Sequence, residues 1–448
     1  MSGALLIRGG HLVDPAAHID APMDLLIEDG CVAQVAEPGT IKATGARTID
    51  ATGHHVLPGL IDTHAHLREP GYEYKETIAQ ACQTAAAGGI TTLFAMPNTE
   101  PVCDSKAVCD LVTARGREAG TARVLPVGAL TRHMDGDVLS DMGELARSGC
   151  PAVSDAWVPI ESSQMMRRAL EYAKGVGMTV ITVPQDLGLS KGGVMHEGEA
   201  ATRLGLSGIP AASEEIAVSR AIALAELSGC PIHLAPLSTS GSVRMVRDAR
   251  ARGLAVTAGT APHYLHCTDR AVNGYNTAAK VYPPLREEAD RDALREGVAD
   301  GTIDTLSSCH APHADFEKAV EFDRAPFGIA GLATALSLTL QLVEEHVLEL
   351  STAVARWTVG PREAFGLEGA GFGTLTEGAP ADLTVVDLAA RWEVTAESLD
   401  GKAASSPFVG DTLPGQVRLT LFGGNPVHGN TADLPTAAAR VQAAGGAA

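Results

Sequence analysis

The chain has 448 residues, 45% of them hydrophobic, and this length favours one large domain with a smaller appendage. Its 54 acidic and 34 basic side chains give a formal net charge of −20, and a field of that sign repels phosphate backbones and anionic lipids. Nucleic acids and membrane surfaces are therefore poor candidates for partners.

The eight cysteines are scattered along the chain and never form a C-x-x-C pair, which argues against a disulfide framework and against a zinc ribbon. We therefore expect reduced thiols in a cytoplasmic protein. The N-terminus shows no secretory signal pattern, and no stretch of the sequence is long and apolar enough to span a bilayer.

Short alternating segments with turn signals predict a small β unit in residues 1–56. Apolar runs then alternate with helical patterns through residues 57–370. The clearest strand candidates in this region are 89–97, 124–130, 178–183, 230–237, 254–262 and 304–308, with helices expected at 162–177 and 212–229. Repeated strand and helix units imply parallel pairing, and about eight of them favour a closed (β/α)8 barrel. An open doubly wound sheet is the alternative.

Strand signals return in residues 371–430, at 381–388, 391–394 and 415–424. This segment and the β unit at 1–56 could pair into one small composite β domain that flanks the barrel. The Ala- and Gly-rich tail at 431–448 has little to bury, so we expect it to be disordered.

The strongest chemical signal is the segment VLPGLIDTHAHLREPG, which follows the first β unit. It places His64 and His66 two residues apart on an extended segment, so both imidazoles point to one side and can share a cation. Arg68 follows on the same face, and its planar guanidinium suits a substrate carboxylate. Two ordinary histidines in a turn are the alternative interpretation, which the flanking residues make less favourable.

The segments PGLIDTHAHLREPG, AMPNTEP, KVYPPLR, HAPH and APFGIAG occur in this order along the chain. In this order and spacing the sequence resembles the dihydroorotases, zinc-dependent cyclic amide hydrolases of the amidohydrolase superfamily that interconvert carbamoyl aspartate and dihydroorotate. The resemblance covers nearly the whole chain and implies a (β/α)8 barrel, a composite β domain and a role in de novo pyrimidine synthesis. It also implies that His64 and His66 bind metal and that Arg68, Asn98 and His313 hold the substrate.

The sequence departs from the family pattern where further metal ligands are expected. A bridging carboxylate is expected in a segment resembling S-D-D-G, and this chain reads Ser-Asp-Ala-Trp at 154–157. Either Asp155 supplies that bridge or Ala156 occupies its position, and no lysine lies nearby to replace it. Val183 and Pro236 stand where the family has two histidine ligands. The second metal site has therefore lost both imidazoles.

Cys309 stands where the family has the catalytic aspartate that binds metal and shuttles a proton. Loss of a general base costs about 10²–10⁴ in rate, so we expect Cys309 to be catalytically non-functional. Because thiolate is a good zinc ligand, His64, His66 and Cys309, with or without Asp155, could still hold at most one zinc ion per chain. The alternative is that Cys309 is a buried, inert cysteine and that the chain binds no cofactor.

We therefore predict an oligomeric, dihydroorotase-like protein that has lost most or all hydrolytic activity. The resemblance implies a structural partnership with aspartate transcarbamoylase. Two alternatives stay open. One is an active cyclic amide hydrolase that uses a single zinc at His64, His66 and Cys309. The other is a sensor of carbamoyl aspartate or dihydroorotate that keeps only the carboxylate-binding residues.

Overall fold

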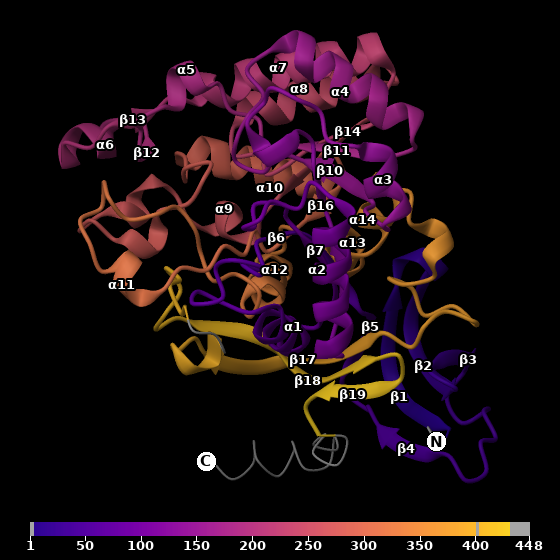
Figure 1. Ribbon diagram of the computed structural model, residues 1–448. Coiled ribbons are helices and arrows are strands. Elements are labelled where there is room, and N and C mark those ends of the chain that lie inside the picture. The colour runs from indigo at the N-terminus through magenta and orange to yellow at the C-terminus, as the bar shows by residue number, and fades with distance from the viewer. Residues whose placement is uncertain (1–3, 400–402, 431–448) are drawn as a thin grey trace.

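The computed structural model describes residues 4–399 and 403–430, and these form a barrel that stands on a twisted β sheet (Figure 1). The tail at 431–448, for which the sequence predicts disorder, lies outside the described residues.

The wall of the barrel is made of parallel strands, eight if β8 and β9 are counted as one interrupted strand. They are β6 (Leu60–Ala65), β7 (Ile90–Ala95), β8 (Arg123–Pro126), β9 (Gly128–Ala129), β10 (Ala152–Ser154), β11 (Thr179–Thr182), β14 (Ile232–Leu234), β15 (Val256–Thr260) and β16 (Thr305–Leu306). A parallel bridge between Ala65 and His310 joins the first strand to the segment after the last. The barrel is therefore closed, as the sequence predicted, and the open sheet is excluded.

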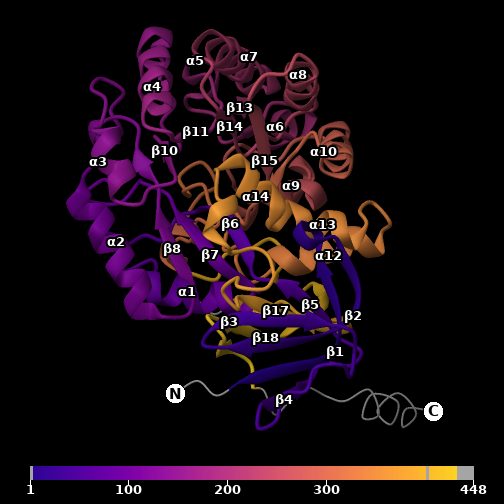
Figure 2. The same ribbon diagram turned by 90° about the vertical axis from the view of Figure 1, so that its right-hand side faces the viewer.

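Helices surround this wall (Figure 2). The longer ones are α1 (Ile78–Ala87), α2 (Lys106–Ala119), α3 (Met142–Arg147), α4 (Ser163–Gly175), α7 (Ala211–Ser228), α8 (Ser240–Ala251), α10 (Glu288–Asp300), α12 (Ala335–Glu344), α13 (Leu350–Trp357) and α14 (Val359–Ala364). In α4 the buried residues Met166, Ala169, Leu170 and Ala173 repeat at helical spacing, so one face packs on the barrel. No helix in the described ranges is both long and apolar enough to cross a membrane.

Short elements fill the connections between the strands and the long helices. An excursion outside the barrel, labelled at the upper left of Figure 1, contains α5 (Leu187–Ser190), β12 (Met195–His196), α6 (Glu199–Leu204) and β13 (Gly208–Ile209). The remaining short helices are α9 (Pro262–His266), α11 (Asp315–Lys318), η1 (Pro15–Ala17), η2 (Arg132–Met134), η3 (Asp269–Val272), η4 (Thr277–Ala279), η5 (Glu368–Ala370) and η6 (Glu397–Leu399).

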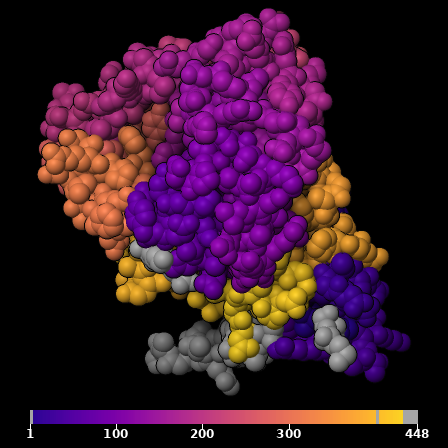
Figure 3. All heavy atoms as spheres, in the orientation of Figure 1, coloured from indigo at the N-terminus to yellow at the C-terminus, as the bar shows by residue number. Residues whose placement is uncertain are grey.

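The sheet below the barrel combines strands from both parts of the chain that the sequence assigned to a β domain. They are β1 (Leu5–Asp14), β2 (Ile19–Glu28), β3 (Cys31–Ala36), β4 (Arg47–Asp50), β5 (His55–Pro58), β17 (Leu383–Glu393), β18 (Thr412–Phe422) and β19 (Asn425–His428). Strand β5 pairs antiparallel with β17, with Val56 opposite Val385. Figure 3 shows the N-terminal and C-terminal segments side by side beneath the barrel.

A buried carboxylate ties the first barrel strand to the loop after the last. The side chain of Asp62, in β6, is fully buried. It accepts hydrogen bonds from the main-chain N–H of Ser308 at 3.1 Å and from the Ser308 hydroxyl. The N–H of His64 also donates to Asp62, at 3.1 Å. This network fixes the ends of β6 and β16, which carry His64, His66 and Cys309.

Candidate functional site

His64 and His66 lie at the carboxyl end of β6, with ring centroids 5.2 Å apart, and each is only 2% exposed. The Nδ1–H of His66 donates to Asn98 Oδ1 at 2.6 Å, which leaves Nε2 as the nitrogen with a free lone pair. Nδ1 of His64 finds no hydrogen-bond partner among the described residues. Burial lowers the pKa of His64 to about 4 and holds the pKa of His66 well below its usual value. Both rings are therefore neutral, the form that binds metals.

The indole of Trp157 lies beside these histidines. Its ring is 4.5 Å from the ring of His66 and nearly perpendicular to it, and the Arg68 guanidinium carbon lies 5.7 Å from the indole centroid. The chain turns at Ala156, where φ is 46°, directly before this side chain. The cavity bordered by His64, His66, Trp157, Pro236 and Cys309 has a volume of only about 20 Å³. This is room for about one water molecule and is too small for a six-membered heterocycle with a carboxylate.

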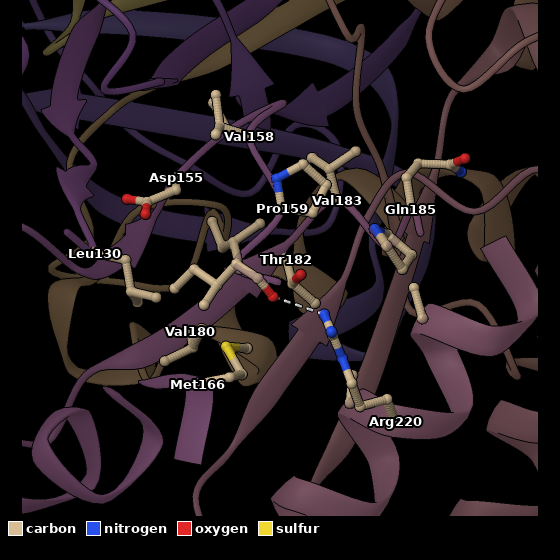
Figure 4. Close-up of a pocket in the computed structure, with 16 residues that line it drawn as sticks. Leu130, Asp155, Val158, Pro159, Met166, Val180, Thr182, Val183, Gln185 and Arg220 are labelled. Atoms are coloured by element: carbon tan, nitrogen blue, oxygen red, sulfur yellow. Dashed lines mark hydrogen bonds between the residues drawn. The ribbon is translucent and has the colours of Figure 1, made fainter. Parts of the chain in front are cut away.

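Asp155 faces away from this cavity. Thr131 donates its main-chain N–H to Asp155 Oδ1 at 2.9 Å and its hydroxyl to Oδ2. Asp155 lines a separate pocket with Val158, Val183 and Arg220 (Figure 4). Burial raises the pKa of Asp155 to about 6, although the hydrogen bonds from Thr131 act to lower it. In this placement both carboxylate oxygens of Asp155 are bonded to Thr131, and its role as a ligand at His64 and His66 stays a prediction.

Cys309 follows β16 in a left-handed conformation, with φ of 47°, and its Sγ lies 3.4 Å from Ser307 Oγ. Burial raises the pKa of the Cys309 thiol to about 12, so without a metal the thiol is protonated at neutral pH and is not a good base. Across residues 4–399 and 403–430, no three His, Cys, Asp or Glu side chains converge in a way that could hold a metal ion. The described side chains therefore form no assembled zinc site, and a single zinc at His64, His66 and Cys309, with or without Asp155, stays a prediction.

Val183 and Pro236, the residues at the expected positions of two histidine ligands, border different spaces. Pro236 lines the small cavity next to His64. Val183 is 1% exposed and lines the neighbouring pocket with Asp155. Neither side chain carries a donor atom for a metal. The cavity beside the two histidines is thus apolar at Pro236, and the neighbouring pocket is apolar at Val183.

The residues expected to hold a substrate carboxylate make bonds within the protein. Arg68 Nε donates to the carbonyl of Pro312 at 3.1 Å. His313 Nε2 donates to the carbonyl of Phe327 at 2.9 Å, and its Nδ1 accepts from Lys75 Nζ at 3.1 Å. Burial, with the nearby charges of Arg68 and Lys75, lowers the pKa of His313 to about 2. A substrate-binding role for Arg68, Asn98 and His313 stays a prediction.

Two residues that shape this region were not singled out in the sequence. Trp157 fills the space beside His66, and Lys75 holds the orientation of His313. For Trp157 a signal existed, since an aromatic residue stands where the family segment S-D-D-G has glycine. Lys75 offered no comparable signal, because one lysine in a loop is usually solvated.

Comparison with known proteins agrees with this architecture. A Dihydro-orotase-like family model matches residues 53–242, and an Amidohydrolase family model matches residues 328–428. An L-hydantoinase (dihydropyrimidinase) from Arthrobacter aurescens superposes with a TM-score of 0.84 at 24% identity, over 96% of each chain, and so shows the same fold.

Two similar sequences cover almost the whole chain. A dihydroorotase from Trichlorobacter lovleyi is 48% identical over 423 residues, which are 94% of this chain and 99% of that relative. A dihydroorotase from Anaeromyxobacter sp. (strain K) is 50% identical over 430 residues, 96% of this chain and 98% of that relative. The chain therefore belongs to the dihydroorotase family of the amidohydrolases.

Proposed function

We propose that this chain is a dihydroorotase homologue of pyrimidine biosynthesis that has lost catalysis and acts as a structural partner of aspartate transcarbamoylase. The observation that carries the proposal is the position of Trp157. Its indole packs against His66 and borders a cavity of about 20 Å³ where a substrate and a metal-bound water would have to fit.

The chemistry of the remaining residues supports the same conclusion. Hydrolysis of an unactivated amide needs a water made nucleophilic by a metal and a base that accepts its proton. The Asp155 carboxylate is bonded to Thr131, and the Cys309 thiol, with a pKa of about 12, is protonated. No side chain bordering the cavity is therefore a free carboxylate that could take the proton from an attacking water.

Outside the site, a buried acidic side chain keeps its hydrogen bonds, which supports an intact scaffold. Glu214 is fully buried and accepts from the N–H groups of Ser238 at 2.9 Å and Thr239 at 3.0 Å. Arg286, from the segment KVYPPLR, lies 3.9 Å from Glu214. Buried polar groups destabilise a fold unless they are paired, so the hydrogen bonds of Glu214 stabilise the barrel whether or not the chain is catalytic. The choice of aspartate transcarbamoylase rests on the family resemblance.

Two measurements on the purified chain test the proposal. Metal analysis after growth in zinc and dialysis should find far less than one zinc per chain, and assays in both directions should find no turnover of carbamoyl aspartate or dihydroorotate. A relative such as the enzyme from Trichlorobacter lovleyi serves as the positive control for the assay. Robust turnover by the isolated chain would refute the loss of catalysis.

The partnership is tested separately by mixing the chain with aspartate transcarbamoylase from the same organism. Size-exclusion chromatography with light scattering should show one complex larger than either component. Separate elution at micromolar concentrations would refute the partnership.

The single-zinc hydrolase makes a different prediction. If metal analysis finds one zinc per chain, and Cys309→Ser loses both the zinc and the activity, the single-zinc hydrolase is the correct alternative.

A further inference from the structure

Three buried cysteines from separate segments meet beside the loop that carries Asn98. Sγ of Cys109 lies 3.4 Å from Sγ of Cys103 and 3.4 Å from Sγ of Cys150. Cys103 follows β7, Cys109 lies in the first turns of α2, and Cys150 lies two residues before the start of β10. Their exposed fractions are 2%, 0% and 5%. This cluster is separate from the cavity at His64 and His66 and has no part in the proposed function.

The arrangement favours oxidation at the central sulfur. Cys109 can accept S–H hydrogen bonds from both neighbours, and these bonds lower the pKa of Cys109 to about 4 against the opposing effect of burial. The thiolate is the form of cysteine that reacts with peroxides, and a second thiol within contact distance converts the first product into a disulfide. Cys109 has two such neighbours, since the sulfurs of Cys103 and Cys150 both lie 3.4 Å from its own sulfur.

We propose that Cys103, Cys109 and Cys150 form a thiol oxidation site, in which a hydroperoxide converts Cys109 into a disulfide with Cys103 or Cys150. In the first step the Cys109 sulfur attacks the peroxide, an S–O bond forms, the O–O bond breaks, and the leaving oxygen departs as water or an alcohol. In the second step the neighbouring sulfur attacks the sulfenic acid, an S–S bond forms, and the hydroxyl leaves as water with the proton of that thiol. Two thiols lose two electrons and the peroxide gains them.

The two disulfides would cross-link different parts of the barrel. The N–H of Cys103 donates to the carbonyl of Pro97 at 3.0 Å, next to Asn98, so a bond to Cys109 would fasten this loop to α2. A bond between Cys109 and Cys150 spans 41 positions of the chain and would fasten α2 to the entry of β10, the strand that leads to Trp157. The site thus links the redox state of the thiols to the loop after β7, at the carboxyl end of the barrel, and to the segment that enters β10.

Peptide mapping of the full-length chain tests the proposal. A Cys82→Ser chain is reduced, freed of reductant, treated with hydrogen peroxide, blocked with iodoacetamide under denaturing conditions and digested with trypsin. Cleavage then separates the three cysteines into peptides 76–106, 107–115 and 148–167. We expect peptide 107–115 to be recovered mostly as a disulfide with 76–106 or 148–167, and dithiothreitol to release it.

Variants identify the central sulfur. In Cys109→Ser, where peptide 107–115 has no cysteine, we expect Cys103 and Cys150 to be recovered alkylated and not linked to each other. Cys103→Ser should leave only the link between 107–115 and 148–167. Cys230→Ser is the matched control, because Cys230 Sγ contacts the carbonyl of Pro231 instead of another thiol, and it should leave both links. The proposal is overturned if Cys109 is recovered fully alkylated under conditions that oxidise the exposed Cys31, or if linked peptides persist in Cys109→Ser.

Discussion

The indole ring of Trp157 lies 4.5 Å from the imidazole ring of His66, at an angle of 70° between the ring planes. The residue that follows the turn at Ala156 therefore fills the space beside the two histidines at the end of β6. Removal of the indole alone would enlarge the cavity, but it would supply no metal ligand and no base. The small cavity volume and the missing metal ligands and base therefore have separate causes. Substitutions can restore the volume and the ligands independently.

The first prediction concerns the restoration of metal binding. We expect neither the natural chain nor Trp157→Gly to retain zinc, because the side chains of Ala156, Val183 and Pro236 carry no metal-binding atom. A fivefold variant, Ala156→Asp, Trp157→Gly, Val183→His, Pro236→His and Cys309→Asp, restores the family pattern and should retain at least one zinc per chain after dialysis. The metal content of the folded protein is measured by mass spectrometry.

The matched control for this experiment keeps Trp157 and carries the other four changes. Because the indole still borders the cavity, we expect this fourfold variant to retain less zinc than the fivefold variant. The interpretation fails if Trp157→Gly alone binds zinc or hydrolyses dihydroorotate.

Much of the fold could be predicted from local patterns, because strands and helices of the barrel repeat with their own periodicities. The boundaries of the strands inside the β domain could not be predicted in this way. The sequence separated 381–388 from 391–394, whereas the structure has the single strand β17, with an irregular register between Asp387 and Arg391. A bulge interrupts the side-chain alternation without ending the strand, so the pattern shows a break where the backbone continues.

The sequence indicated at which positions site residues are expected, but not in which direction their side chains point. The sequence left open whether Asp155 or Ala156 occupies the bridging position, since a shift of one residue reverses which side chain points inward. The direction of Asp155 is set by Thr131, 24 positions earlier in the chain, and no local pattern contains that contact. The orientation of Trp157 likewise depends on the left-handed backbone of Ala156.

The second prediction uses the raised pKa of Asp155. Its pKa of about 6 in the folded chain exceeds the usual 3.8, so the folded state binds this proton more tightly than the unfolded state. The carboxyl therefore lowers stability as the pH rises from about 4 to 6, and the loss is complete above that range. We expect Asp155→Asn to gain stability relative to the natural chain between pH 4 and pH 7, by at most about 3 kcal/mol.

Urea denaturation at several pH values between 4 and 7 measures this difference. The exposed Asp137, in the same region of the chain as Thr131, provides the control, and Asp137→Asn should follow the curve of the natural chain. A constant difference between Asp155→Asn and the natural chain across this range would contradict the prediction.

The third prediction concerns the reactivity of Cys309. Because the Cys309 thiol has a pKa of about 12, the fraction present as thiolate at pH 8 is about 10⁻⁴. The cavity beside it has a volume of about 20 Å³, which leaves little room for a reagent. Iodoacetamide should therefore modify the exposed Cys31 of the native chain long before Cys309. Peptide mapping over time at pH 7, 8 and 9 measures both rates. Rapid modification of Cys309 at pH 7 would instead indicate a thiolate available for zinc.

The fourth prediction concerns the buried pair of Arg286 and Glu214, which are 2% and 0% exposed. Arg286 donates from Nη1 to the carbonyl of Ile209 at 2.7 Å and from Nε to Ser238 Oγ at 3.1 Å. Arg286→Met would remove these bonds and leave the Glu214 carboxylate without its counter-charge. We expect the free energy of unfolding to fall by about 3–5 kcal/mol, as for other buried pairs that lose one partner. Urea denaturation at pH 7 gives this value.

A matched arginine on α10 shows whether the effect comes from burial. Arg291 forms its ion pair with the exposed Asp292 at 2.8 Å, where solvent screens the interaction, so Arg291→Met should cost about 1 kcal/mol or less. The double variant Glu214→Gln with Arg286→Met removes the unpaired charge and should be more stable than Arg286→Met alone, since an amide is less costly to bury than a carboxylate. If Arg286→Met costs no more than Arg291→Met, the pair does not stabilise the scaffold.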